Sequence, residues 1–187
     1  DALATLAGLV RESETLVDRL DTICTTIVEH LRAGGKILTF GNGGSATDAM
    51  HLAEELVGRY RSDRRPLPAV CLNTDASALT CIANDFGYNA VFARQVEALA
   101  RHGDVVVAFS TSGNSPSITQ GLAAARDARA TTVGLLGRDG GDALALCDHA
   151  FVVPHTSTAR IQELHTLALH LICEAVERAF AEEQPTN

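Results

Sequence analysis

Short apolar runs alternate with stretches of helical periodicity along most of this 187-residue chain. The runs are rich in Val, Ile, Leu and Thr and end at Gly, Pro or polar residues, which is typical of buried strands. Strands that are joined through helices run parallel, because each crossover returns the chain to the same edge of the sheet. We therefore predict an α/β fold: a doubly wound, five-stranded parallel sheet flanked by helices, in a single domain over residues 1–187.

The predicted elements follow from this alternation. Strands are expected at residues 36–40, 69–73, 104–110, 131–137 and 150–154. Helices are expected at residues 46–57, 77–83, 89–101 and 117–129, with a short one near 142–146. No internal repeat or low-complexity linker interrupts this order, so one sheet accommodates all five strands.

Helices are also expected at both ends of the chain. Apolar residues between Leu16 and Leu31 recur at three- and four-residue steps, which predicts an amphipathic helix that Gly34 and Gly35 end. A shorter helix is expected over residues 3–10, so that residues 1–33 form an N-terminal helical extension.

The last helix is expected to run from Ala159 to about Glu182. Its middle, residues 167–173, is apolar nearly all the way round. A helix without a polar face must be covered on every side. We therefore expect the C-terminal and N-terminal helices to pack in a homo-oligomer.

Composition and charge exclude several classes of function. A net charge of −8 argues against a broad nucleic-acid surface, and no apolar run approaches the roughly 18 residues of a membrane-spanning helix. The basic segment 59–65 is either a solvated loop or an anion-facing one. Five cysteines without C-x-x-C spacing, and no basic-then-apolar leader after Asp1, predict reduced thiols and a cytoplasmic location.

Two loops at predicted strand ends have the composition of phosphate-binding loops. After the third strand, the segment 110–115 offers hydroxyls and free backbone N–H groups at a helix N-terminus. The alternative is that these side chains only cap the helix, for which one residue would suffice. The hydroxyls belong to Ser110, Thr111, Ser112 and Ser115.

The other loop, Gly41-Asn-Gly-Gly-Ser45, follows the first strand. Gly41, Gly43 and Ala46 satisfy the dinucleotide fingerprint G-x-G-x-x-A. The acidic residue that this fingerprint requires about 20 positions further on is not at that spacing, because Asp75 lies well beyond it. Close approach of the backbone to a small ligand explains the glycines better.

Two polar sets on predicted helices are candidate sites. His51 and Glu55 share one helix face, and such a pair can bind a metal ion, although it is more often a solvated surface pair. Gln162, His165 and His170 interrupt the apolar C-terminal helix. A histidine there is either a core residue satisfied by a hydrogen bond or part of a site, since buried polar groups need partners.

Four segments together carry a resemblance to a known family: FGNGGSATDAMHLAEELVGRY, CIANDFG, FSTSGNS and ARIQELHTLALH. Over nearly its whole length the chain resembles the phosphoheptose isomerases of the sugar isomerase (SIS) domain superfamily. The resemblance implies a homotetramer that interconverts sedoheptulose 7-phosphate and D-glycero-D-manno-heptose 7-phosphate. It also implies one Zn²⁺ per subunit.

Site residues are carried over from the resemblance position by position. The implied zinc ligands are His51, Glu55, Gln162 and His170. The implied substrate-binding residues are Asn42, Gly43, Gly44, Glu55, Asn84, Asp85, Ser110, Thr111, Ser112, Ser115 and Gln162. The family further suggests Glu55 as the base and His170 as the acid partner that move a proton between C1 and C2 through an enediol.

Helix geometry limits this ligand set. Gln162 and His170 are eight residues apart, which is ~12 Å of rise on a straight helix, whereas zinc ligands must lie roughly 2 Å from one ion. Either Gln162 lies at the frayed start of the helix, or the site combines residues from neighbouring chains. Glu54 is expected to point elsewhere.

Alternative functions come from other classes of protein. Some relatives are non-catalytic SIS-domain tetramers that regulate a bacterial replication initiator, but the resemblance implies that these lack the residues matching Glu55 and His170. A phosphosugar-sensing SIS module usually has an attached DNA-binding domain, for which this chain has no room. A dinucleotide enzyme is the least favoured alternative.

Overall fold

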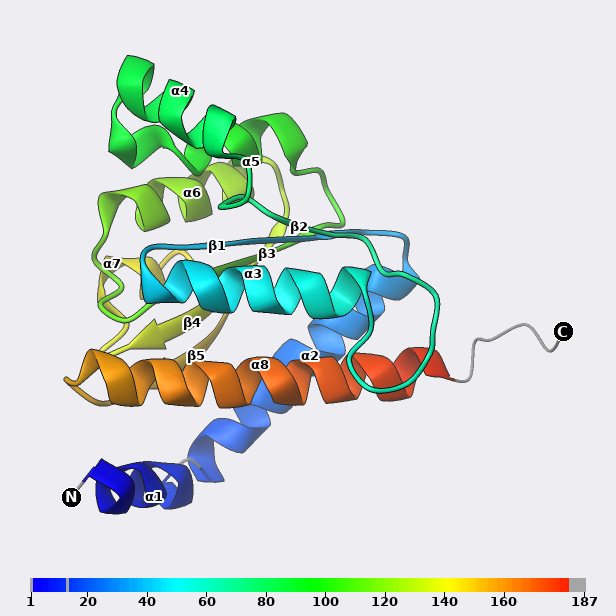
Figure 1. The fold of residues 1–187 in the computed structure, drawn as a ribbon, viewed down its shortest axis with the longest axis vertical. Coiled ribbons are helices and arrows are strands. Elements are labelled where there is room, and N and C mark those ends of the chain that lie inside the picture. Colours follow the sequence, from blue (N-terminus) through cyan, green and yellow to red (C-terminus); the bar gives the residue numbers. More distant parts are fainter. Residues whose placement is uncertain (1, 13, 182–187) are drawn as a thin grey trace, which may run out of the picture.

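The computed structural model, which describes residues 2–12 and 14–181, contains one sheet of five parallel strands (Figure 1). The strand order is β2-β1-β3-β4-β5. The strands are β1 (Ile37–Gly41), β2 (Ala69–Cys71), β3 (Val105–Ser110), β4 (Thr131–Gly137) and β5 (His149–Val153). The predicted fold class and all five predicted strands are confirmed.

The second strand is shorter than predicted, because a side chain replaces its last backbone pairing. The side-chain amide of Asn73 donates to the carbonyl of Gly41 (2.8 Å) and its oxygen accepts from the Gly41 N–H (3.1 Å). The Leu72 N–H still donates to the Thr39 carbonyl at 2.8 Å, so backbone bonding to β1 ends at Leu72, and the Asn73 side chain holds the end of β1.

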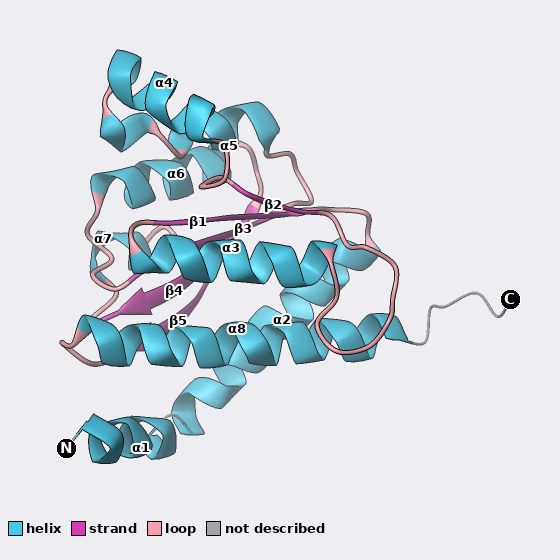
Figure 2. Ribbon diagram, viewed as in Figure 1, coloured by secondary structure: helices cyan, strands magenta, loops and turns pink. Residues whose placement is uncertain are grey.

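Helices cover both faces of the sheet (Figure 2). Alternate side chains of β1 show the two layers: Ile37 packs in a core with α2, α3 and α8, and Leu38 packs in a second core with α5 and α6. The helices are α1 (Ala2–Glu12), α2 (Glu14–Arg32), α3 (Gly44–Val57), α4 (Ala76–Phe86), α5 (Ala93–Leu99), α6 (Pro116–Asp127), α7 (Gly141–Leu144) and α8 (Thr158–Phe180).

The helix predicted over residues 89–101 is divided. A 3₁₀ turn, η1 (Tyr88–Ala90), precedes α5, and Val91 and Phe92 lie between them. Both side chains are fully buried, and the Phe92 ring stacks on Phe40 with ring centroids 4.7 Å apart. Seating these two consecutive side chains in the core accompanies the break between η1 and α5.

The helices α3 and α8 lie side by side and run in the same direction on one face of the sheet (Figure 1). Their register is visible in two contacts. The Thr166 hydroxyl of α8 donates to the Asp48 carboxylate of α3 at 3.0 Å. One turn earlier, the Gln162 amide lies so close to Gly44 that an added Cβ would come within 2.5 Å of its Nε2. Each turn of α3 therefore faces a matching turn of α8.

The C-terminal helix begins one residue earlier than predicted, and the expected end at Glu182 lies outside the described residues. Its middle buries Ala168, Leu169 and Ile172, but Leu167 and Leu171 stay 43% and 39% exposed. The apolar run is therefore only partly covered within one chain. None of the helices in residues 2–12 and 14–181 combines the length and apolar composition needed to cross a membrane.

His165 is a core residue of α8. Its Nε2 bonds the Leu136 carbonyl of β4 at 3.0 Å, while its Nδ1 has no hydrogen-bond partner among the described residues. The imidazole is fully buried, and this burial lowers its pKa from 6.5 to about 4. The sequence left open whether His165 belongs to the core or to a site, and the structure places it in the core.

This buried imidazole makes stability depend on pH. Between about pH 6.5 and 4 the unfolded chain takes up a proton at His165 that the folded chain does not, so stability is lost as the pH falls. The two pKa values differ by an amount worth roughly 3 kcal/mol. A His165→Leu variant should lack this part of the dependence, measured by urea unfolding between about pH 7.5 and 4.5.

The matched control is the exposed His102. A His102→Gln variant should keep the wild-type dependence on pH. The prediction fails if His165→Leu and the wild type lose stability equally over this range.

Candidate active site

The strand order places the two phosphate-loop candidates together. Beyond β1 the sheet continues to β2 on one side and to β3 on the other, so the winding reverses between β1 and β3. Ligands of open parallel sheets bind at such a point, beyond the carboxyl ends of the strands. The glycine loop leaves β1 there and the serine loop leaves β3, so the two predicted loops begin side by side at the carboxyl edge of the sheet.

The serine loop connects β3 to α6. The Ser110 hydroxyl accepts from the Gly113 N–H (3.0 Å) and the Ser112 hydroxyl accepts from the Asn114 N–H (3.2 Å). Ser115 occupies the N-cap position of α6, yet its side chain makes no capping hydrogen bond. The interpretation of these hydroxyls as helix caps therefore fails at the position where a cap belongs.

The segment that follows β4 holds the serine loop in shape. Gly113 has φ 68°, and an added Cβ there would lie 1.9 Å from the Gly140 carbonyl oxygen. Thr111 is half-buried, and its carbonyl oxygen would lie 2.5 Å from a Cβ on Gly137. Glycine is thus required at both contacts, and the loop is a tight, preformed turn.

The glycine loop is organised around Asn42. Its amide donates to the Ser117 hydroxyl of α6 (2.9 Å), and its oxygen accepts from the Tyr88 hydroxyl (2.8 Å). Gly43 stands at the N-cap of α3 with φ 57° and no side chain to cover the first N–H groups of the helix. Gln162 lies beside Gly44, the next residue. We call Asn42, Gly43, Gly44 and Gln162 the loop set.

Asn84 and Asp85 end α4 and are exposed. The Asn84 amide donates to the Asp85 carboxylate at 2.7 Å. Tyr88, three residues further on, connects this segment to Asn42. The structure thus links the predicted pair to the loop set through Tyr88, which the sequence analysis did not identify.

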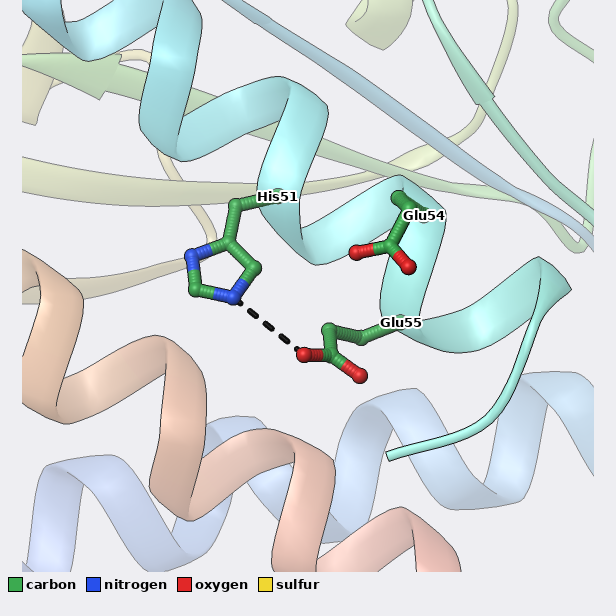
Figure 3. Close-up of side chains that lie close together, drawn as sticks. All are labelled: His51, Glu54 and Glu55. Carbon is green, nitrogen blue, oxygen red and sulfur yellow. Dashed lines mark hydrogen bonds and ion pairs between the residues drawn. The ribbon is translucent and has the colours of Figure 1, made fainter. Parts of the chain in front are cut away.

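A second polar set lies further along α3, where the structure brings together three of the predicted residues. The His51 Nε2 lies 3.3 Å from the Glu55 Oε1, and the side chains are 34% and 15% exposed (Figure 3). The His170 ring of α8 meets the His51 ring edge-on, with centroids 5.0 Å apart. We call His51, Glu55 and His170 the histidine–glutamate set.

Glu54 corrects a prediction from the sequence. It was expected to point elsewhere, but its carboxylate and the ligand atoms of His51 and Glu55 all lie within 4.8 Å of one another (Figure 3). Glu54 is exposed, and its long side chain turns back toward the pair. Helical spacing predicts the direction of the Cβ but not the path of a flexible side chain.

Two further residues surround this set and were not identified from the sequence. The Tyr60 ring lies 5.8 Å from the His170 ring. Asp48, one turn before His51, is buried, and burial raises the pKa of its carboxyl group, opposed by the bond from Thr166 and by nearby His51. The spacing of residues 48, 51 and 55 is that of one helix face, which was the available signal for Asp48.

Within this set, His51 and Glu55 suit a metal ion, and with Glu54 they form a group that could hold one. Two ligand atoms at roughly 2.1 Å from one tetrahedral ion are about 3.4 Å apart, which matches the 3.3 Å between His51 and Glu55. Imidazole nitrogen and carboxylate oxygen are both common zinc ligands. These residues therefore fit a bound divalent cation.

Gln162 does not join them within one chain. It lies in the second turn of a continuous α8, so the proposed frayed helix start is wrong. Its amide faces Gly44, whereas His51 and Glu55 are about 10 and 16 Å further along α3. The chain thus presents the loop set and the histidine–glutamate set as two separate groups.

Known proteins of one family are similar to this chain in sequence. The SIS domain family matches residues 3–137. A phosphoheptose isomerase from Pelobacter propionicus is 56% identical over 154 residues, 82% of each chain. A phosphoheptose isomerase from Aliarcobacter butzleri is 50% identical over 179 residues, covering 96% of this chain and 95% of that protein.

Solved structures show the same relationship. The phosphoheptose isomerase GmhA from Neisseria gonorrhoeae is 42% identical, covers 95% of both chains and superposes with a TM-score of 0.89. A phosphoheptose isomerase from Francisella tularensis is 28% identical with a TM-score of 0.84, over 95% of this chain and 99% of that one. The chain therefore belongs to the SIS domain family and, within it, to the phosphoheptose isomerases.

Proposed function

We propose that this protein is an aldose–ketose isomerase that converts sedoheptulose 7-phosphate to D-glycero-D-manno-heptose 7-phosphate. The observation that carries the proposal is the pairing of Glu55 with His51 beside His170. An isomerase needs groups that take a proton from one carbon and protonate oxygen, and carboxylate and imidazole provide them. The names of the relatives supply the substrate class.

The loop set and the serine loop bind the substrate in this proposal. Hydroxyls and backbone N–H groups at the start of α6 hold the phosphate without a cation. The sugar hydroxyls meet the amides and carboxylates around the crevice. The phosphate ligands are Ser110, Thr111, Ser112 and Ser115, and the sugar ligands are Asn42, Gly43, Gly44, Glu55, Asn84, Asp85 and Gln162.

Glu55 acts as the base and His170 as its acid partner. Because a carboxylate bound to zinc is a poorer base, Glu55 is a metal ligand in one state of the site and the base in another. The Glu55 carboxylate removes the proton from the carbon beside the carbonyl, which yields the enediol, and the proton is returned to the adjacent carbon. His170 donates a proton to the developing C2 oxyanion and then takes the proton of the C1 hydroxyl as the aldehyde forms, so that both residues return to their starting states. The Glu55 side chain is 15% exposed, which limits its contact with bulk water.

We propose that the metal is Zn²⁺, one per subunit, with His51, Glu55, Gln162 and His170 as its ligands. The ion, when bound, polarises the substrate carbonyl and stabilises negative charge on its oxygen. His51 and Glu55 have the separation that two ligands of one such ion require. Gln162 reaches the same ion only from another subunit.

A homotetramer with shared active sites meets this requirement. The loop set of one subunit would join the histidine–glutamate set of a neighbour, bringing Gln162 to His51. Exposed Leu167 and Leu171 on α8, with Val10 and Val17 of the N-terminal helices, line an apolar groove that a neighbouring subunit would cover.

The remaining parts of the proposal concern the unit and its location. Residues 1–187 form one SIS domain, and residues 1–33 are its helical extension. The five cysteines are all free, which suits a reducing compartment, so we propose the cytoplasm. The partners are the sugar phosphate and further copies of the chain, with neither nucleic acid nor membrane involved.

The first test is turnover. The zinc-supplemented protein should convert sedoheptulose 7-phosphate to the aldose, followed by NMR. A Glu55→Gln variant should lose about 10²–10⁴-fold in kcat, because the amide cannot accept the proton. Glu97→Gln, at an exposed glutamate of α5, is the matched control. A folded, zinc-loaded wild type without turnover would point to a regulatory phosphosugar-binding role instead.

The metal assignment is tested by zinc affinity in competition with a chelator. His51→Ala should weaken zinc binding by at least about 10-fold, because an imidazole ligand is lost. Glu54→Gln should bind zinc like the wild type if Glu54 is outside the ligand set. Unchanged affinity in His51→Ala would refute the assignment, and weakened affinity in Glu54→Gln would add Glu54 to the ligands.

If the active site is shared between subunits, a substitution that prevents assembly should also abolish turnover. A Leu167→Glu variant places a charge on the exposed apolar face of α8 and should sediment as smaller species with little turnover. The control is Leu99→Glu, at an exposed leucine of α5. A monomeric variant with full turnover would defeat the shared site, and an intact tetramer would remove this face from the interface.

A further inference from the structure

The loop between α3 and β2, residues 58–68, folds back over the end of α3 and is fastened to α8. The buried Glu177 carboxylate of α8 accepts from the backbone N–H groups of Arg61 (2.8 Å) and Ser62 (2.7 Å). The Arg61 guanidinium also pairs with Glu174 of α8 at 2.9 Å. The loop is thus bonded to the two turns of α8 that follow His170.

Within this loop, Arg64 meets the last turn of α3. Its side chain is 7% exposed, and its Nη2 donates to the Glu55 carbonyl at 2.6 Å. Its Nη1 donates to the carbonyls of Leu56 (3.0 Å) and Arg65 (2.9 Å). Carbonyls in the last turn of a helix lack intrahelical donors and form the negative end of its dipole, so a guanidinium is well matched to them.

Of these carbonyls, that of Glu55 depends most on Arg64. The Leu56 carbonyl also accepts from the Leu67 N–H at 3.0 Å and keeps this donor without Arg64. Without Arg64, the Glu55 carbonyl would lose the guanidinium N–H that donates to it. Glu177 and Glu55 are also the nearby charges that favour the cationic form of Arg64, which offsets the cost of its burial.

We propose that Arg64 is a positioning residue for Glu55. By holding the Glu55 carbonyl, the guanidinium fixes the last turn of α3 and with it the carboxylate that faces His51. This inference rests on the proposed function of Glu55 as the base. A 1 Å displacement of a catalytic group can cost 10²-fold in rate, so the effect belongs to kcat. Apart from Glu55 itself, the proposed substrate ligands lie away from this end of α3, so KM should change less than kcat.

The experiment compares Arg64→Met and Arg64→Lys with the control Arg65→Met. Arg65 is an exposed neighbour whose guanidinium lies over the Phe180 ring, away from Glu55. We expect Arg64→Met to lower kcat about 10- to 100-fold, with KM within about 2-fold of wild type. Arg64→Lys should recover part of kcat, because an ammonium donates to a carbonyl but lacks the planar fork. Arg65→Met should match the wild type.

A crystal structure of Arg64→Met separates this inference from the proposed function. The Glu55 carboxylate should move by more than about 0.5 Å relative to the wild type. An unmoved carboxylate overturns the inference, as does a folded Arg64→Met enzyme with wild-type kcat or a loss confined to KM. Absence of turnover in the wild type refutes the proposed function instead, and the position of Glu55 in the two crystal structures then decides the role of Arg64.

Discussion

The parallel packing of α3 against α8 determines where the candidate functional side chains lie. The bond from Thr166 to Asp48 and the contact of Gln162 with Gly44 set a register in which each turn of one helix faces one turn of the other. In this register His170 comes level with His51. A shift by one turn would separate these rings by about 5.4 Å. The histidine–glutamate set therefore depends on an interhelical register that lies within the core.

The same register separates Gln162 from the residues with which it shares a proposed ion. Two parallel helices in fixed register cannot bring the second turn of α8 to the third and fourth turns of α3. A site that needs both ends of this helix pair must draw them from different copies of the chain. The proposed oligomer would also bury the exposed leucines of α8, Leu167 and Leu171.

Residue periodicity predicted most of the fold and part of the site. The five strands, the glycine and serine loops at the strand ends and the i, i+4 pairing of His51 with Glu55 all follow from local sequence. The contact of His51 with His170 could not be predicted in this way, because it depends on the register between two helices far apart in the chain. Arg64 was not identified either, because the sequence predicts only that its basic segment is a solvated loop or an anion-facing one, and the contact with the end of α3 appears only in the folded chain. The division of the predicted helix at Phe92 likewise reflects core packing.

The position of Glu55 explains why a cationic side chain lies beside its backbone. Glu54 and Glu55 stand near the carboxyl end of α3, where the helix dipole and the unsatisfied carbonyls disfavour negative charge. Two adjacent carboxylates at such an end are stable when positive groups compensate them. Arg64 supplies this positive charge as a guanidinium at the carbonyls, and the His51 Nε2 lies 3.3 Å from the Glu55 carboxylate. A divalent cation between His51 and Glu55 would complete the same compensation. The electrostatics of the helix end and the proposed metal site thus have one physical origin.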